Sequence, residues 1–207
     1  MGRRNCRSYN EYKSTRMKII LGSSSPSRKK LLKNTGIDFK VKSPTIDEAT
    51  QKKEFKGKKK DLAIYLAEKK ALSIQAKPKD IIIGADQVLL HSNKIYDKPK
   101  SIHEAKRHLK ELSNKTHSLI SGTVISKKNK IIWRHQSVSK MEMHKLTNKE
   151  INEYLSQSGK SILKCVGAYN IEGYGSKLFK KIDGDFFSIV GLPLIQLLNA
   201  INKIGKN

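Results

Sequence analysis

Residues 80–90, DIIIGADQVLL, constrain the fold more than any other part of the 207-residue chain. Nearly every position is apolar and polar residues do not alternate, so the run predicts a strand buried on both faces. Such a strand requires other elements to cover both faces. Asp86 lies inside the run, and a buried carboxylate is costly unless it is paired or binds a metal. Gly84, on the same strand face, is expected to leave room for a ligand.

The rest of the chain predicts strands and helices in mixed order. The expected strands are 17–24, 39–44, 91–96 (after a turn), 116–126 and 131–146. The expected helices are 26–35, 61–76, 102–113, 148–158 and about ten residues near the C-terminus, with Ser25 as an N-cap and capping boxes at Ser101/Glu104 and Thr147/Glu150. Residues 50–60 are rich in Lys and predict a mobile connection. This order indicates an α/β fold with a long, partly antiparallel sheet.

Domain organisation and compartment follow from simple patterns. Residues 1–16 are basic and lack the apolar run of a secretory signal, so we expect a disordered extension followed by a single domain over 17–207. No apolar run approaches the roughly 18 residues of a membrane span, so no membrane association is expected. Cys6 and Cys165 make no disulfide framework, which favours a reducing, cytoplasmic location.

The formal charge of +25 has two explanations. A basic chain attracts polyanions, and a non-catalytic nucleic-acid-binding protein is therefore an alternative reading. However, only seven of the 43 basic residues are Arg, the residue that reads bases by paired hydrogen bonds, and the lysines are scattered. Charge alone does not decide between nucleic-acid binding and compositional drift, and drift is the favoured explanation.

The segment Ser23-Ser24-Ser25-Pro26-Ser27-Arg28 joins the first strand to the first helix. Free backbone N–H groups and the helix dipole make this turn a natural phosphate seat, with hydroxyls and Arg28 as further donors. An ordinary, well-capped surface helix explains the same residues equally well.

Three further charged residues are candidates. Glu48 lies in an expected loop, where acids are common, but with Asp86 it would form a site for a hard divalent cation. Lys70 shares a helical face with apolar residues, so it either reaches an anion or extends to solvent along that face. Lys98 precedes Pro99, which holds it extended, although a solvated lysine is the default reading.

Several separate stretches stand in the order found in one known family. They are IILGSSSPSRKKLL, SPTIDE, LAEKKA, IIGADQVL, KP at 98–99, LSNKTHSLISG and IEGYGSKLF…IDGDFFSIVGLPL. From Met17 to about Ile204 the chain resembles the Maf family of nucleotide pyrophosphatases. The resemblance implies an α/β fold related to the inosine-triphosphate pyrophosphatase type, with a cleft between two lobes. It also implies hydrolysis of a nucleoside triphosphate to the monophosphate and pyrophosphate, with a divalent metal (Mg²⁺ or Mn²⁺).

The resemblance also assigns roles by position. Asp86 matches the proton acceptor that activates water, and Glu48 matches an acidic residue near the metal, so Glu48 and Asp86 are the expected metal ligands. The expected phosphate-binding residues are Ser24, Arg28, Lys70 and Lys98. General-base catalysis, a bridging metal and cations that neutralise developing charge form a coherent mechanism for attack at the α-phosphorus.

Three positions bear on the choice of base. One branch of the family, which prefers dTTP and UTP, carries Arg, Thr and Gln there; a second, the 7-methyl-GTP pyrophosphatase branch, carries Trp, Gln and Glu. This chain has Ser27, Gln87 and Glu172 and so matches the second branch at two of the three. The resemblance thus favours 7-methyl-GTP or another modified nucleotide, with dTTP/UTP or broad specificity as the alternative. A homodimer is compatible with the sequence.

Overall fold

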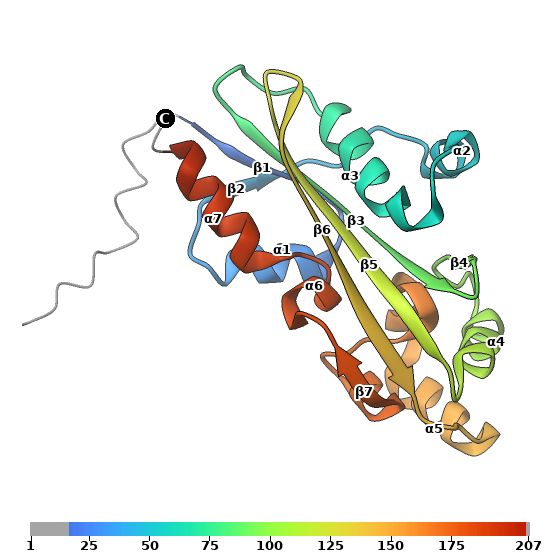
Figure 1. Cartoon of the computed structure of the whole chain (residues 1–207). Helices are drawn as coiled ribbons and strands as arrows, with labels where there is room; N and C mark the ends of the chain where they lie inside the picture. Colours follow the sequence, from blue (N-terminus) through green and yellow to red (C-terminus); the bar gives the residue numbers. More distant parts are fainter. Residues whose placement is uncertain (1–16, 206–207) are drawn as a thin grey trace, which may run out of the picture.

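The computed structural model describes residues 17–205, whose strands form one seven-stranded mixed sheet (Figure 1). The expected extension at residues 1–16 lies outside the described residues. The strands are β1 (Ile19–Gly22), β2 (Phe39–Val41), β3 (Ile81–His91), β4 (Lys94–Tyr96), β5 (Thr116–Lys127), β6 (Lys130–Met143) and β7 (Phe179–Asp183). The α-helices are α1 (Pro26–Lys33), α2 (Glu48–Glu54), α3 (Leu62–Leu72), α4 (Ile102–Leu112), α5 (Asn148–Ser158), α6 (Phe186–Val190) and α7 (Leu194–Gly205). Four 3₁₀ helices are η2 (Lys59–Asp61), η3 (Gly159–Lys164), η4 (Val166–Ala168) and η5 (Tyr174–Leu178). The α/β fold predicted from the sequence is confirmed.

Strand β3 is shared between two partners along one of its edges. Its first half pairs with the parallel strand β1 as far as Gly84, opposite Gly22. Its last residues pair with the antiparallel strand β4, beginning at Leu89 opposite Tyr96. On the other edge β5 pairs along almost the whole strand. Residues 85–88 therefore have an unpaired edge, between the end of one neighbour and the start of the next.

Helices cover both faces of the sheet. Helix α3 packs on one face, where Ala67 and Ala71 contact the apolar side chains of Ile20 and Ile82. Helices α1, α6 and α7 pack on the opposite face (Figure 1). The expectation that Gly84 leaves room for a ligand is wrong. A Cβ atom there would lie 2.2 Å from the backbone oxygen of Ala67, so the glycine admits the close approach of α3.

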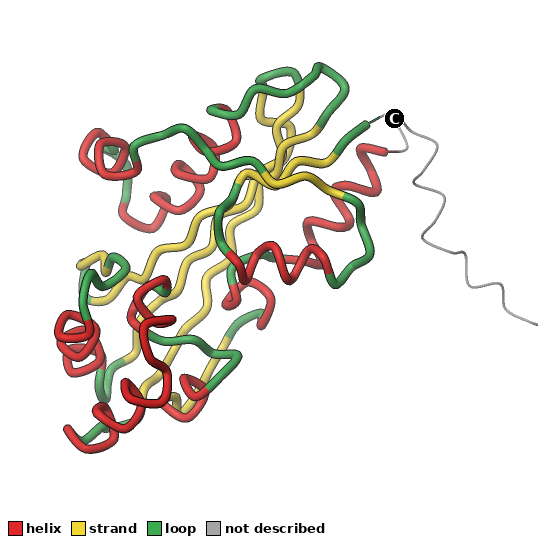
Figure 2. Tube along the Cα trace, turned by 180° about the vertical axis from the view of Figure 1, so that it is seen from behind, coloured by secondary structure: helices red, strands yellow, loops and turns green. Residues whose placement is uncertain are grey.

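The structure has two lobes that share the long strands β3, β5 and β6. One lobe carries α1, α2, α3 and α7, and the other carries α4, α5 and the 3₁₀ helices η3 to η5 (Figure 2). The second lobe has its own core of buried apolar side chains, which includes Leu89, Leu109, Met141 and Ile162. The two lobes therefore face each other across the unpaired edge of β3.

Two local expectations need correction. Residues 50–60 are not simply a connection, because they contain most of α2 and begin η2. Glu48 does not lie in a loop but in the first turn of α2, which Asp47 caps by accepting a hydrogen bond from the Ala49 N–H. The Lys-rich composition concealed this helix because all of its residues lack a buried face. None of the helices among residues 17–205 is long and apolar enough to cross a membrane.

Candidate active site

A cleft opens at the unpaired edge of β3 and consists of two adjoining cavities. The first, of about 260 Å³, extends toward η4 and the second lobe, and the other, of about 400 Å³, lies over the turn before α1. The residues common to both cavities are Ser25, Arg28, Glu48, Lys98 and Lys164. These shared residues mark the neck of the cleft, where a long ligand that occupied both cavities would have to pass.

The centre of the site is an ammonium held between two carboxylates. Lys70 Nζ lies 2.5 Å from Asp86 Oδ1 and 2.8 Å from Glu48 Oε1. Lys70 and Asp86 are only 7% and 6% exposed, so neither ion is hydrated as it would be in water. The free-energy cost of burying the Asp86 carboxylate is thus offset by the ammonium of Lys70, which reaches it from the apolar face of α3.

Glu48 is the more exposed member of this cluster, with 46% of its side-chain surface accessible. Burial would raise the pKa of Glu48, but the ammonium of Lys70, with Lys98 and Lys52, outweighs it and holds the pKa below its usual range. Glu48 is therefore ionised at neutral pH and faces the neck of the cleft.

Arg28 is fixed beside this cluster by three hydrogen bonds. Its Nε donates to the Gly191 carbonyl at 2.9 Å, and its Nη1 donates to the Ala85 carbonyl at 3.0 Å and to Ser23 Oγ at 3.3 Å. Ala85 has its carbonyl free because no strand pairs with β3 at that edge. Burial lowers the pKa of Arg28, while Asp86 and Glu48 oppose this shift. Arg28 thereby presents a positively charged group at a defined place in the neck.

The turn that precedes α1 lines the second cavity. Ser25 caps the helix by accepting the Arg28 N–H at 3.5 Å, as the sequence predicts, and Pro26 is the first helical residue. Ser24 is exposed in the wall of the second cavity, and Ser27 lies in the wall of the first. The structure thus brings this turn together with the cluster around Lys70.

The remaining two predicted residues are placed differently. Gln87 lines the first cavity, and its Nε2 donates to Ser121 Oγ and to the carbonyls of Ser188 and Ile189. Its amide nitrogen is therefore used within the protein, and Oε1 is left as the polar atom for a ligand. Glu172 is not among the described residues that line either cavity; it forms a salt bridge with Lys30 at 3.1 Å.

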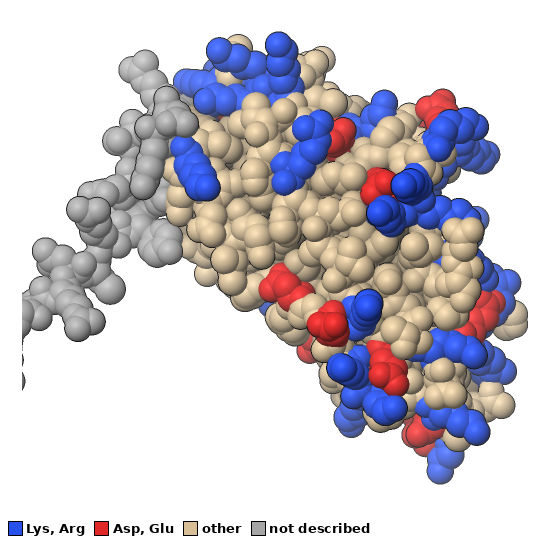
Figure 3. Space-filling model, in the orientation of Figure 1, with Lys and Arg blue, Asp and Glu red and all other residues tan. Residues whose placement is uncertain are grey.

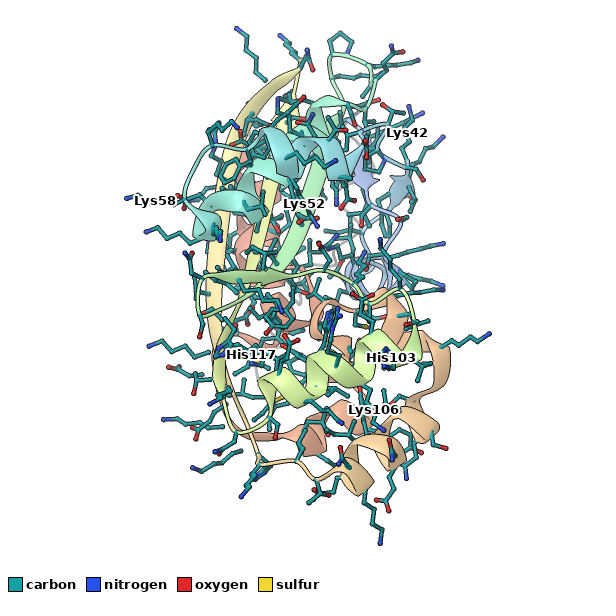
Figure 4. All side chains as sticks on the ribbon, turned by 90° about the vertical axis from the view of Figure 1, so that its right-hand side faces the viewer. Lys42, Lys52, Lys58, His103, Lys106 and His117 are labelled. Atoms are coloured by element: carbon teal, nitrogen blue, oxygen red, sulfur yellow. The ribbon has the colours of Figure 1, made fainter. Side chains whose placement is uncertain are left out.

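Sequence reasoning missed several residues of the cleft. The described residues that line it also include Lys52, Lys164, Cys165, Tyr169 and Asn170. Lys52 forms an ion pair with Asp97. Figure 4 labels Lys52 beside α2. No spacing rule marks these residues, since Lys52 reaches the cleft from the exposed helix α2 and the others from a 3₁₀ helix and loops far from β3 in the chain.

The cleft therefore has two sides of different character. We call Arg28, Glu48, Lys70 and Asp86 the Asp86 wall, and Lys98, Lys164, Cys165, Tyr169 and Asn170 the Lys98 wall. The Asp86 wall belongs to the first lobe and β3, and the Lys98 wall belongs to the second lobe. Cations on both walls suit an anionic ligand, and the ionised carboxylate of Glu48 with Asp86 provides oxygen ligands of the kind that Mg²⁺ prefers. Within residues 17–205 no group of three or more His, Cys, Asp or Glu side chains forms a metal site.

The fold and the cleft define a class of α/β proteins with a buried carboxylate in a cation-lined cleft between two lobes. The chain belongs to the Maf family, since the family described as Maf-like protein matches residues 18–204. This confirms the membership predicted from the sequence motifs.

Curated proteins from several bacteria are similar to the chain over most of their length. The 7-methyl-GTP pyrophosphatase of Brucella abortus biovar 1 (strain 9-941) is 42% identical over 191 residues, which cover 90% of this chain and 96% of that protein. The nucleoside triphosphate pyrophosphatase of Hyphomonas neptunium (strain ATCC 15444) is 39% identical over 186 residues, 88% and 94% of the two chains. The 7-methyl-GTP pyrophosphatase of Rhizobium meliloti (strain 1021) is 38% identical over 191 residues, 90% and 96%.

Proposed function

We propose that this protein is a cytoplasmic enzyme that hydrolyses a nucleoside triphosphate between its α- and β-phosphates. The observation that carries the proposal is the position of Asp86, buried beside Lys70 and Glu48 at the neck of a cleft lined with cations. The names of the similar Brucella and Hyphomonas proteins support the same reaction.

In this mechanism Asp86 accepts a proton from the attacking water as the water oxygen bonds to the α-phosphorus. The bond from the α-phosphorus to the bridging oxygen breaks, and pyrophosphate leaves with that oxygen. Arg28 and Lys98 neutralise charge on the phosphate oxygens, and Lys70 holds the Asp86 carboxylate in place before the substrate binds. The positive end of the α1 dipole and the Ser24 hydroxyl add to this binding, whereas the Ser25 N–H donates to Ser23 Oγ.

The proposed cofactor is a divalent cation, Mg²⁺ or Mn²⁺. Glu48 and Asp86 would hold it, because Mg²⁺ is usually bound by one or two carboxylates together with substrate phosphates. Such a cation supplies charge stabilisation for the phosphate oxygens. The fit is favourable because both carboxylates already share one cation, the Lys70 ammonium, in this structure.

For the base we propose 7-methyl-GTP or a related purine nucleotide. Gln87 lines the cleft and its Nε2 is engaged within the protein, which leaves its Oε1 as an acceptor that suits the N–H and amino donors of a guanine edge. Glu172 would add a second acceptor after release from Lys30. Ser27 is a small residue that lines the same cavity as Gln87 and provides no aromatic ring on which a base could stack. Hydrolysis of dTTP and UTP, or broad specificity, is the alternative.

A substrate panel tests the proposal. The wild-type protein is incubated with 7-methyl-GTP, GTP, dTTP and UTP, with Mg²⁺ or Mn²⁺, and the release of monophosphate and pyrophosphate is measured. We expect the highest kcat/KM for 7-methyl-GTP. A clear preference for UTP would contradict the purine assignment and leave the reaction intact.

The role of Asp86 is tested separately with Asp86→Asn, which is expected to lower kcat by about 10²- to 10⁴-fold. Asp38→Asn, at an exposed site between α1 and β2, is the control and should keep wild-type activity. Near-wild-type turnover by Asp86→Asn would show that the proposed base is wrong.

Nucleic-acid binding is the competing function. Lys and Arg side chains on the face shown in Figure 3 are scattered between uncharged regions and do not form one continuous stripe. Tight, salt-sensitive binding of DNA or RNA without turnover of any triphosphate would favour this second function over the enzyme.

A further inference from the structure

Lys164 is the last residue of η3 and lies at the neck of the cleft. It lines both cavities, as only four other described residues do. Among residues 17–205 it has no hydrogen-bond or ion-pair partner, although ten ion pairs form elsewhere in the same part of the chain. Two other lysines that line the cleft are paired, Lys52 with Asp97 and Lys70 with Asp86 and Glu48, so an unpaired ammonium at this position needs an explanation.

The two cations of the Asp86 wall are already engaged. Arg28 donates to the carbonyls of Gly191 and Ala85, and Lys70 donates to two carboxylates. On the Lys98 wall neither Lys98 nor Lys164 has a hydrogen-bond or ion-pair partner in the described part of the chain. The charge available for an incoming polyanion therefore comes mainly from the second lobe.

The backbone at Lys164 is held in place from both sides. Ile162, two residues earlier, is completely buried in the core of the second lobe. The N–H of Cys165 donates to the Ile162 carbonyl at 3.0 Å and closes the turn. The stem of Lys164 thus starts from a fixed point at the cleft.

A neighbour in the same 3₁₀ helix shows that this placement is particular to Lys164. Lys160 is also exposed, but it lines a separate hollow between α4 and α5, together with His103 and Lys106. Figure 4 shows His103 and Lys106 on α4, in the second lobe. Two lysines four residues apart therefore point to different surfaces, and only Lys164 meets the neck of the cleft.

We propose that Lys164 is a further substrate-binding residue, which holds the β- and γ-phosphates of the triphosphate from the side opposite Asp86. This inference rests on the proposed function and extends it. When the bond to the α-phosphorus breaks, negative charge develops on the departing pyrophosphate, and the ammonium of Lys164 stabilises that charge. Lys98 and Lys164 then hold the polyphosphate together from the Lys98 wall.

The experiment compares Lys164→Gln with Lys160→Gln, two variants that remove the same charge from the same 3₁₀ helix. Binding of inorganic tripolyphosphate in the presence of Mg²⁺ is measured by calorimetry, because it needs no turnover. We expect the Kd of Lys164→Gln to rise about 10- to 100-fold, the range for hydrogen bonds to charged groups, and that of Lys160→Gln to stay within about twofold of wild type. Lys164→Arg, which keeps the charge, should restore most of the affinity.

Turnover of the preferred triphosphate is then measured for the same variants. Lys164→Gln should lower kcat/KM and raise the inhibition constant of pyrophosphate by similar factors. Equal tripolyphosphate affinity of Lys164→Gln and Lys160→Gln would overturn the role of Lys164. A wild-type protein that binds tripolyphosphate through Lys164 but releases no pyrophosphate from any triphosphate would instead contradict the proposed function.

Discussion

The charged side chains on the two walls of the cleft differ in whether they pair with other groups of the protein. On the Asp86 wall the charged groups neutralise and fix one another: Lys70 joins Asp86 to Glu48, and Arg28 is tied to two backbone carbonyls. On the Lys98 wall the lysines Lys98 and Lys164 are unpaired within the described residues and rise from loops and a 3₁₀ helix. One wall is organised before a ligand arrives, whereas the other acquires its partners from the ligand.

The two walls therefore meet two different requirements of the proposed reaction. Proton transfer needs a carboxylate at a fixed place, since small misplacement costs rate. Holding a flexible polyphosphate needs positive charge that can adjust its position. Two of the four predictions that follow test the Asp86 wall, and the other two test the groups behind the Lys98 wall and beside the cleft; the order is that of decreasing expected effect.

The largest effect is expected from Lys70→Met. Removing the ammonium leaves Asp86 as a buried carboxylate without its partner, and breaking a buried pair in this way costs about 3–5 kcal/mol of the free energy of unfolding. The free energy is measured by urea denaturation. Mn²⁺ should raise the melting temperature of Lys70→Met more than that of wild type, because a bound cation would take the place of the ammonium between the two carboxylates.

Lys69→Met is the matched control for this variant. Lys69 is the preceding residue of α3, and its ammonium lies over the exposed face of Tyr65, 5.3 Å from the ring centroid, so its loss should cost about 0.5–1 kcal/mol. Similar costs for Lys69→Met and Lys70→Met would show that the ionic cluster does not stabilise the fold.

The second prediction concerns the neutral pair behind the Lys98 wall. His117 lies within 2.8 Å of the Tyr169 hydroxyl, and burial lowers the pKa of His117 to about 4. Because this value is below the usual 6.5, the unfolded state binds more protons between about pH 6.5 and pH 4. The stability contribution of neutral His117 is therefore fully present above pH 6.5 and declines as the pH falls through that window, by up to about 1.4 kcal/mol per pH unit.

The measurement is the free energy of unfolding of wild type and His117→Gln from pH 7.5 to pH 4.5. Glutamine does not titrate, so the wild type should lose stability relative to the variant as the pH decreases. Parallel curves for the two proteins would mean that His117 is already accessible to protons in the folded state.

The third prediction concerns the backbone ties of Arg28. Arg28→Lys keeps the charge but cannot make the bonds to both Gly191 and Ala85, so we expect a loss of about 1–3 kcal/mol in the free energy of unfolding. Arg107→Lys on α4, where the side chain is exposed and paired with Glu104, is the control and should change stability by less than about 1 kcal/mol. An unchanged melting temperature of Arg28→Lys would show that the hydrogen bonds of Arg28 do not make the Asp86 wall rigid.

The smallest effect is expected at Glu172. Its salt bridge with Lys30 is largely exposed, so Glu172→Gln should change stability by less than about 1 kcal/mol. If Glu172 reaches the base only after leaving Lys30, Lys30→Met should increase the ratio of 7-methyl-GTP to UTP turnover, and Glu172→Gln should decrease it. Ratios that do not change in either variant would assign base selection to other residues, with Gln87 as the first candidate.

That Asp86 is a buried carboxylate in need of a partner could be predicted from the sequence, because it violates the pattern of its own strand. The helix start at Ser25 and Pro26 was equally readable, since capping depends on adjacent residues. The sequence marks Lys70 as a charged residue on an apolar face but does not identify its partners, because Glu48, Lys70 and Asp86 meet only through the packing of α2 and α3 on the sheet.

The features that the sequence did not predict correctly also depend on how elements pack in the folded protein. Gly84 was expected to make room for a ligand, whereas the close packing of α3 uses that space. Helix α2 was missed because a helix without a buried face has no apolar periodicity. Lys164 had no signal at all, since nothing in the local sequence distinguishes it from Lys160.

The divided edge of β3 has a consequence for how such clefts can change in evolution or by engineering. The opening spans the residues between the last partner on β1 and the first partner on β4. The length of the opening is therefore set by the number of backbone pairs that β1 and β4 make with β3. Adding or deleting a single pair at the Tyr96 end of β4 would resize the mouth and would also move Tyr96 and Asp97, which line it.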